Sequence, residues 1–456
     1  MLQLSGIQTG QVLQRRRGGA TVTVSGRATT TGSLTVALRR GSVTVSEWRR
    51  RVLRKISRAG DFTVTVSGLP VGGPFTLWFT LADAGAALGP FYVGDVWILA
   101  GQSNMQGRAR RPPQGEGGPL VRALRLNRRW ARAADPLHLL AESPDAAHYA
   151  GPPLTAAQIE KLLAAEPRGG GPGVWFGNAM FRADGVPQGL ICAAHGGTSM
   201  TQWSPKLKKL GGGSLYGSLL RTVSGTGQPV AGVLWYQGEN DANPADAPRY
   251  TLRMKELVAA LRRDLRQPRL PWVIVQLART TSLADQWSWF AVREQQRTLP
   301  LTVRDLAVVA ALDLPMDDWI HVGGEGMPVL GRRLALALRA LRGDGRLPPD
   351  VAAARRLPAR GDVPARIEVT LKNIVGGLRV PRAAGGFFIV SAAGAIKRDI
   401  FSRVAAVDGR LLLDLAGDFD RAGDRLMYGQ ELNTDARITD GRDLALPAFG
   451  PLAVTG

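Results

Sequence analysis

Short segments that alternate apolar and polar residues fill the first ninety positions of the chain. Turns rich in glycine, serine and threonine separate them, and the segments read ATVTVSG, SLTVALRR, DFTVTVSG and FTLWFTLA. A period of two gives each strand one apolar face, and repeated short strands of this kind are typical of a β-sandwich. We therefore expect residues 1–90 to form an N-terminal β-sandwich domain.

From about residue 91, continuous apolar runs replace the alternation. There are five of them: DVWILA, GLICAA, VAGVLWY, PWVIVQLA and LAVVAALDL. Strands that are buried on both faces have this composition. Segments with helical character lie between and after them: VWFGNAMFRA, RYTLRMKELVAALRRDL, DQWSWFAVREQQRTL and MPVLGRRLALALRALR. This pattern predicts a parallel sheet with helices on both faces, in an α/β domain over residues 91–343.

Two other parts of the chain follow different patterns. Residues 108–172 are rich in arginine, proline and glycine, and we expect them to form an irregular excursion from the sheet without a clear strand. After the linker GDGRLPPDVAAARRLPARGD, the segments ARIEVTL, GFFIVSA and RLLLDLA return to a strand-like pattern. We therefore expect a linker and a C-terminal β-rich domain over residues 344–456.

Polar residues cluster directly after four of the five apolar runs. GQSNM follows the first run, HGGTSMTQW the second, QGENDA the third and PMDDWIH the fifth. In an open parallel sheet, ligands bind beyond the carboxyl ends of the strands. The four clusters therefore predict one functional site at that edge of the sheet.

The residue types in these clusters suit acyl transfer. A serine hydroxyl needs an adjacent base, histidine is the usual base, and a carboxylate orients the imidazole. We expect Ser103 to be the nucleophile and His321 the base, because Asp318 lies three residues before it, on the same side of a helical turn. Asp317 and Asp313 are the alternatives to Asp318 as the orienting carboxylate.

The other three histidines are weaker candidates for the base. His138 and His148 lie in the irregular excursion, and His195 has no carboxylate close to it in sequence.

A developing oxyanion needs N–H donors that are already aimed at it. Candidates are the backbone amide of Ser103, a glycine amide from Gly196 or Gly197, and the side-chain amide of Asn240 or Gln237. Glycine suits this position because it lets the backbone approach a substrate closely. The residues leave the choice between Asn240 and Gln237 open.

The order of these polar clusters resembles that of the SGNH-hydrolase superfamily, and their residue sequences resemble those of the sialate O-acetylesterase family. The matching phrases are VGDVWILAGQSNM, GGTSMTQW, GVLWYQGENDA and DDWIHVGGEGMPVLGRRLA. Looser similarity extends to the N-terminal VLQRRRGGATVTVSGRA and the C-terminal LMYGQELNTDARITDGRDLALPAF, and it is patchy over 108–172. The resemblance implies an SGNH-type, flavodoxin-like α/β/α hydrolase domain between two β-rich domains.

The resemblance also implies roles for individual residues. It makes Ser103 the nucleophile, His321 the base and Asp318 its partner, with Ser103, a glycine of the 196–197 pair and Asn240 forming the oxyanion hole. Two positions depart from the family pattern. Asn240 stands where the family usually has serine or alanine, and Val322 stands where a proline usually follows the histidine.

The function implied is a carbohydrate O-acetylesterase that most resembles sialate O-acetylesterases and uses no metal or other cofactor. The substrate would be an acetylated carbohydrate, and Trp203 and Glu239 are candidates to contact it. Trp235 and Tyr236 also flank the site, but aromatic residues beside apolar strands usually belong to the core. Alternatives are the same chemistry on acetyl-xylan or another glycan, and a catalytically silent carbohydrate-binding protein.

Charge and cysteine content add limits to these expectations. The net charge is +21, and 50 of the 58 basic residues are arginine, a bias that a GC-rich coding sequence produces on its own. The basic residues are scattered, so we expect no specific nucleic-acid partner. The one cysteine, Cys192, permits no intrachain disulfide and is expected to be buried. No signal peptide or membrane span is visible, so we expect a cytoplasmic protein or one whose leader was removed.

Overall fold

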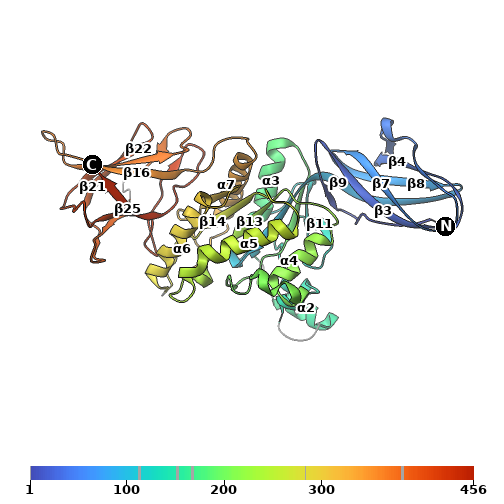
Figure 1. Cartoon of the computed structure of the whole chain (residues 1–456), viewed down its shortest axis with the longest axis horizontal. Helices are drawn as coiled ribbons and strands as arrows, with labels where there is room; N and C mark the ends of the chain where they lie inside the picture. The colour runs from blue at the N-terminus through green and yellow to red at the C-terminus, as the bar shows by residue number, and fades with distance from the viewer. Residues whose placement is uncertain (1, 111–114, 150–153, 166–168, 283, 382–384) are drawn as a thin grey trace.

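A computed structural model describes residues 2–110, 115–149, 154–165, 169–282, 284–381 and 385–456. The molecule is elongated, with the N-terminal strands at one end and the C-terminal strands at the other (Figure 1). Buried apolar side chains gather in three large clusters, one in the N-terminal strands, one around the central sheet and one in the C-terminal strands. Within the described ranges, no helix is both long and apolar enough to cross a membrane. The expected mixed α/β class is confirmed.

The N-terminal strands form two facing groups. One is an antiparallel sheet of three strands in the order β1–β3–β7, and the other is built around β4 and β8. The bounds are β1 (Leu2–Ser5), β2 (Val12–Gln14), β3 (Gly19–Ala28), β4 (Gly32–Arg40), β5 (Val43–Thr44), β6 (Arg51–Ile56), β7 (Gly60–Pro70) and β8 (Gly72–Leu81). Along β3, buried Val22 and Val24 alternate with exposed Thr21 and Thr23. The period-two pattern therefore fills the core between the strands.

Strand β9 (Ala84–Gly101) links the N-terminal strands to the central sheet. Its first half pairs with β8 in the antiparallel sense, and its second half pairs in the parallel sense with β12 (Gln188–Cys192) and β13 (Gly232–Tyr236). The boundary that we expected at residue 90 therefore falls inside one continuous strand.

The central sheet has the strand order β11–β10–β12–β9–β13–β14–β15. All its neighbouring pairs are parallel except β10 and β11. Beside β9, its strands are β10 (Val121–Leu124), β11 (Trp130–Arg132), β12 (Gln188–Cys192), β13 (Gly232–Tyr236), β14 (Trp272–Gln276) and β15 (Leu306–Ala310). The five apolar runs of the sequence correspond to β9, β12, β13, β14 and β15.

Helices cover both faces of this sheet. Helices α3 and α7 contact each other on one face, and α5 and α6 lie together on the other (Figure 1). The helices are α1 (Ser103–Gln106), α2 (Ala156–Ala165), α3 (Pro172–Asp184), α4 (Leu215–Ser224), α5 (Tyr250–Asp264), α6 (Gln286–Thr298) and α7 (Gly326–Leu341).

The expectation that residues 108–172 contain no clear strand is wrong. Strand β10 pairs with β12 and extends the parallel sheet, and β11 adds an antiparallel edge strand. The sequence pattern hid β10 because it has only four residues, VRAL, one of them charged. The guanidinium of Arg122 lies 5.4 Å from the centre of the Tyr92 ring, so the charge stacks on an aromatic side chain.

The C-terminal strands form a sheet of eight strands in the order β20–β19–β23–β25–β16–β17–β22–β21, and β18 and β24 form a separate pair. The bounds are β16 (Asp350–Leu357), β17 (Arg366–Lys372), β18 (Leu378–Arg379), β19 (Phe387–Val390), β20 (Ile396–Lys397), β21 (Phe401–Val407), β22 (Arg410–Leu415), β23 (Arg425–Tyr428), β24 (Thr439–Asp440) and β25 (Phe449–Thr455). Buried Arg293 of α6 donates to the carbonyl oxygens of Gly429 and Glu431 at 2.8 and 2.9 Å. These bonds fix the C-terminal strands to the central sheet's helical layer.

Candidate active site

Strand β9 ends in a sharp turn that carries Ser103. Gly101 has a φ of +125°, and a Cβ atom there would lie 2.1 Å from the carbonyl oxygen of Tyr236 on β13. Only glycine fits such a position. Ser103 then opens the short helix α1 and is 8% exposed. The turn therefore places the serine at the carboxyl edge of the sheet, within reach of the loops that follow the neighbouring strands.

The imidazole of His321 lies between Ser103 and Asp318. Its Nε2 is 2.9 Å from Ser103 Oγ, and its Nδ1 is 2.8 Å from Asp318 Oδ2. Asp318 Oδ1 accepts hydrogen bonds from the backbone N–H groups of Ile320 and His321, at 2.9 and 2.8 Å. Burial by itself raises the pKa of Asp318, but the hydrogen bonds from the imidazole and the two amides outweigh it and hold that pKa below its usual value. A carboxylate at this position favours the tautomer with the proton on Nδ1, which leaves Nε2 free to accept the serine proton.

Two glycines in the loop after β12 lie beside the serine. A Cβ atom on Gly196 would be 3.2 Å from Ser103 Cβ, and the Gly196 N–H already donates to Gln106 Oε1 at 2.7 Å. Gly197 has a φ of +70°, and its N–H donates to no atom of the described residues. The exposed side chain of Asn240 donates one N–H to the carbonyl oxygen of Gly197 at 3.2 Å. Gly197 and the second N–H of Asn240 therefore remain available for an external acceptor.

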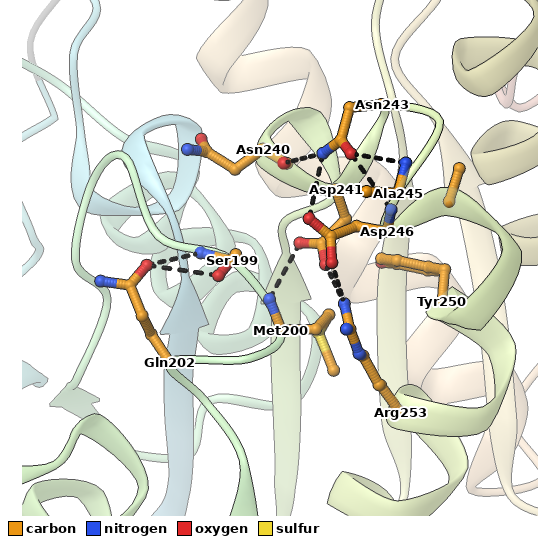
Figure 2. Close-up of polar contacts among 12 residues, drawn as sticks. Ser199, Met200, Gln202, Asn240, Asp241, Asn243, Ala245, Asp246, Tyr250 and Arg253 are labelled. Atoms are coloured by element: carbon orange, nitrogen blue, oxygen red, sulfur yellow. Dashed lines mark hydrogen bonds and ion pairs between the residues drawn. The ribbon is translucent and has the colours of Figure 1, made fainter.

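Gln237 and Asp241 belong to a buried network instead. Gln237 Nε2 donates to the carbonyl oxygen of Thr198 at 3.0 Å and to Asp241 Oδ2 at 2.6 Å. Asp241 also accepts from the N–H of Met200 at 2.9 Å and pairs with Arg253 at 3.2 Å, as Figure 2 shows. The network ties the loop after β12 to the loop after β13 and uses both N–H groups of the Gln237 side chain.

Comparison with known proteins identifies the family. Residues 93–340, more than half of the chain, match the carbohydrate esterases described as sialic acid-specific acetylesterases. The chain belongs to this family. The esterase is 29% identical over 271 residues to a probable carbohydrate esterase of Arabidopsis thaliana, a match that covers 54% of this chain and 91% of the relative.

Two further relatives have names that describe them as acetylesterases. It is 26% identical over 268 residues to human sialate O-acetylesterase, covering 52% of this chain and 48% of the human protein, so the match spans about half the length of that relative. It also resembles the crystal structure of XAC1771, a carbohydrate acetylesterase from Xanthomonas citri, with a TM-score of 0.68 and 97% coverage of both chains. At 21% identity, that likeness shows a shared fold.

The two alternative aspartates of the esterase have other partners. Asp317 Oδ2 accepts a hydrogen bond from the backbone N–H of Arg110 at 2.7 Å, and Asp313 pairs with the buried Arg333 at 2.6 Å. Asp318 is thus the carboxylate that contacts His321.

The remaining histidines are buried or partly buried and do not contact Ser103. His195 Nδ1 lies 3.2 Å from His148 Nδ1, and the two rings stack with centres 5.2 Å apart. His138 Nδ1 lies 3.0 Å from the carbonyl oxygen of Gln106. Burial lowers the pKa of His138 and His195 to about 4 and that of His148 to about 3, so all three are neutral at physiological pH.

The two residues that we expected to contact substrate, Trp203 and Glu239, are both engaged by other side chains of the protein. Trp203 is fully buried, its Nε1 donates to Thr198 Oγ1 at 2.9 Å, and its ring packs edge-on against Trp235. We therefore assign Trp203 to the core, because a sugar needs an exposed ring face to stack on. Glu239 Oε1 accepts a hydrogen bond from Asn104, and burial raises the pKa of Glu239 to about 7.

Three residues near the site were not found from the sequence. Asn104 directly follows the serine, Gln106 lies three residues after it, and both make hydrogen bonds across the site loops. Trp319 lies between Asp318 and His321 and is 56% exposed. Asn104 and Trp319 stand inside the polar clusters GQSNM and PMDDWIH, and Gln106 lies one residue beyond the first of them, but the sequence alone does not show which side chains face inwards.

Proposed function

We propose that the esterase removes O-acetyl groups from carbohydrates through a serine-based acyl-enzyme, with O-acetylated sialic acids as its substrate class. The observation that carries the proposal is the contact of His321 with both the Ser103 hydroxyl and the Asp318 carboxylate. The family match supports an acetylated carbohydrate as substrate.

In the first step, His321 Nε2 takes the proton of Ser103 Oγ as the oxygen attacks the acetyl carbonyl carbon. The carbonyl π bond opens to an oxyanion, and Asp318 stabilises the imidazolium that forms. His321 then gives its proton to the sugar oxygen as the ester C–O bond breaks. The sugar leaves as an alcohol, and the acetyl group stays on Ser103.

In the second step, His321 removes a proton from a water molecule that attacks the acetyl-serine. Collapse of the second tetrahedral intermediate releases acetate, and the proton returns to Ser103 Oγ. In both steps the oxyanion would accept hydrogen bonds from the backbone amides of Ser103 and Gly197 and from the side chain of Asn240. Gly196 supports them by packing against the serine, and no step passes through a metal ion.

For the sugar ring we propose Trp319 in place of Trp203. Its carbonyl oxygen accepts hydrogen bonds from Thr280 Oγ1 at 2.7 Å and from the N–H of Thr281 at 3.0 Å, so its backbone is fixed while most of its surface is exposed. An exposed indole two residues from the base gives a sugar an apolar face to stack on.

The Ser103→Ala variant tests the proposal. Hydrolysis of an aryl acetate should fall to the background rate while the thermal midpoint stays near that of the wild type. A variant that keeps more than a few per cent of the wild-type kcat would contradict the assignment of the nucleophile. If the wild type itself hydrolyses no acetyl ester, the protein is a silent carbohydrate-binding relative.

A substrate panel tests the sugar. We expect kcat/KM for O-acetylated sialic acids to exceed that for acetyl-xylan oligosaccharides. A higher kcat/KM for acetyl-xylan oligosaccharides would leave the acyl-enzyme mechanism in place but would replace sialic acids with xylan as the substrate class.

A further inference from the structure

The side chain of Asn104 joins the nucleophile turn to the peptide groups on both sides of His321. Its Oδ1 accepts a hydrogen bond from the N–H of Val322 at 2.9 Å, and its Nδ2 donates to the carbonyl oxygen of Ile320 at 3.3 Å. Asn104 is 1% exposed and directly follows Ser103 in the chain. One amide group therefore holds the backbone of His321 from the residue next to the nucleophile.

Glu239 holds this amide from the opposite side. Its Oε1 accepts a hydrogen bond from Asn104 Nδ2 at 2.8 Å, and its Oε2 is buried without a hydrogen-bond partner among the described residues. Glu239 belongs to the loop after β13, so three site loops meet at Asn104. The acceptor also fixes which way the amide faces, since a rotation by 180° would direct its N–H groups at the Val322 N–H and its oxygen at two acceptors.

Within the described residues, the other hydrogen bonds of the His321 loop do not tie its backbone to the residues next to Ser103 in the chain. Asp318 is three residues from His321 on the same loop, so it orients the imidazole without fixing the loop relative to Ser103. Trp319 is bound to Thr280 and Thr281, which precede α6, and Asp317 is bound to Arg110.

We infer that Asn104, oriented by Glu239, is a positioning residue that sets the distance between His321 Nε2 and Ser103 Oγ. The inference rests on the proposed serine mechanism and adds residues that touch neither the acetyl group nor the sugar. Because a displacement of about 1 Å costs on the order of 10²-fold in rate, loss of this link acts on kcat.

The Asn104→Ala variant gives the first test, with Asn178→Ala as its matched control. Asn178 is also a largely buried asparagine that holds a loop through both ends of its amide, since it accepts from the Gly118 N–H and donates to the Glu116 carbonyl, each at 2.9 Å. We expect Asn104→Ala to lower kcat for an aryl acetate by about 10²-fold with little change in KM. Asn178→Ala should lower the thermal midpoint about as much as Asn104→Ala does, but it should leave kcat unchanged.

A second pair of variants tests the role of Glu239 and does not depend on an alanine at position 104. Asn104→Asp keeps the oxygen that faces Val322 but removes both donated bonds, so kcat should fall. Adding Glu239→Gln to that variant restores a donor and an acceptor between the two side chains and should recover about tenfold in kcat. A role in stability alone would restore the thermal midpoint without restoring kcat.

The outcomes separate this inference from the proposed function. Activity in Ser103→Ala would overturn the serine mechanism and the inference with it. If Ser103→Ala is inactive but Asn104→Ala loses no more kcat than Asn178→Ala, the inference is wrong and the mechanism stands. If adding Glu239→Gln does not raise the kcat of Asn104→Asp, Glu239 has no part in positioning His321.

Discussion

Substitution by alanine should affect mainly kcat at Asn240 and mainly stability at Gln237, although both residues carry an amide and lie three positions apart. Gln237 donates to the Thr198 carbonyl and to the buried Asp241 carboxylate. Losing a hydrogen bond to a charged group costs about 1.5–3 kcal/mol, and a neutral one about 0.5–1.5 kcal/mol, so Gln237→Ala should destabilise by roughly 2–4 kcal/mol. For a domain of this size that corresponds to roughly 5–15 °C in the thermal midpoint.

The exposed Asn240 has less to lose in stability. Its two side-chain bonds, to the Gly197 carbonyl and from the Gln102 side chain, lie at 3.2 and 3.1 Å on an accessible loop. As an oxyanion donor it would act mainly on the transition state, so Asn240→Ala should lower kcat by about 10²–10³-fold with little change in KM.

Measuring kcat, KM and the thermal midpoint for both variants on one aryl acetate distinguishes the two roles. Asn243→Ala controls for general loosening of this loop, because among the described residues the Asn243 side chain bonds to the Asn240 carbonyl oxygen, to the Ala245 N–H and to Asp246, all in its own turn. A large kcat loss at a normal midpoint in Gln237→Ala, with a normal kcat in Asn240→Ala, would reverse the assignment of the oxyanion donor.

Three further expectations follow from the same contacts. Burial raises the pKa of Glu239 from 4.5 to about 7, so between these pH values the folded state holds a proton that the unfolded state has released. The free energy of unfolding should therefore fall as pH rises through this range, by about 3 kcal/mol in total. Glu239→Gln should remove this part of the pH dependence in denaturant titrations at pH 4.5, 6 and 8, and an unchanged dependence would contradict it. Trp319→Ala should raise KM for a glycan substrate by about 3–10-fold while leaving the kinetics on an aryl acetate within twofold, and equal effects on both substrates would refute the stacking role. Activity should survive dialysis against a chelator, and a loss that a divalent ion restores would show that a metal takes part.

The sequence predicted the parts of the fold in which burial is uniform. The second half of β9, from Phe91, and the strands β12, β13, β14 and β15 are buried on both faces, so nearly every position in them is apolar and the pattern is unambiguous. Strand β10 was missed because Arg122 interrupts its four residues, and the stacking that accommodates the charge depends on Tyr92, thirty positions earlier.

The same distinction applies to the site. Asp318 and His321 were paired from their spacing because their contact forms within a single turn. The contacts of Asn104 with Glu239 and of Gln106 with Gly196 join residues 135 and 90 positions apart, so no local pattern shows them. Trp203 shows the converse error, since a position beside a polar block suggested exposure and the fold turned the ring inwards.

The long-range contacts of the site share one chemical feature, because neutral amide side chains make most of them. Gln102, Asn104, Gln106 and Gln237 are all buried, and each bonds to a loop other than its own. An amide offers a donor and an acceptor at once, so it can bind both an N–H and a C=O of a neighbouring backbone, and its burial costs far less than that of a charge. Such side chains can fix the loops around Ser103 without placing a second charge beside the imidazole. This leaves Asp318 as the one carboxylate that contacts His321 within the described residues, and Asp318 is the group that stabilises the imidazolium in the proposed mechanism.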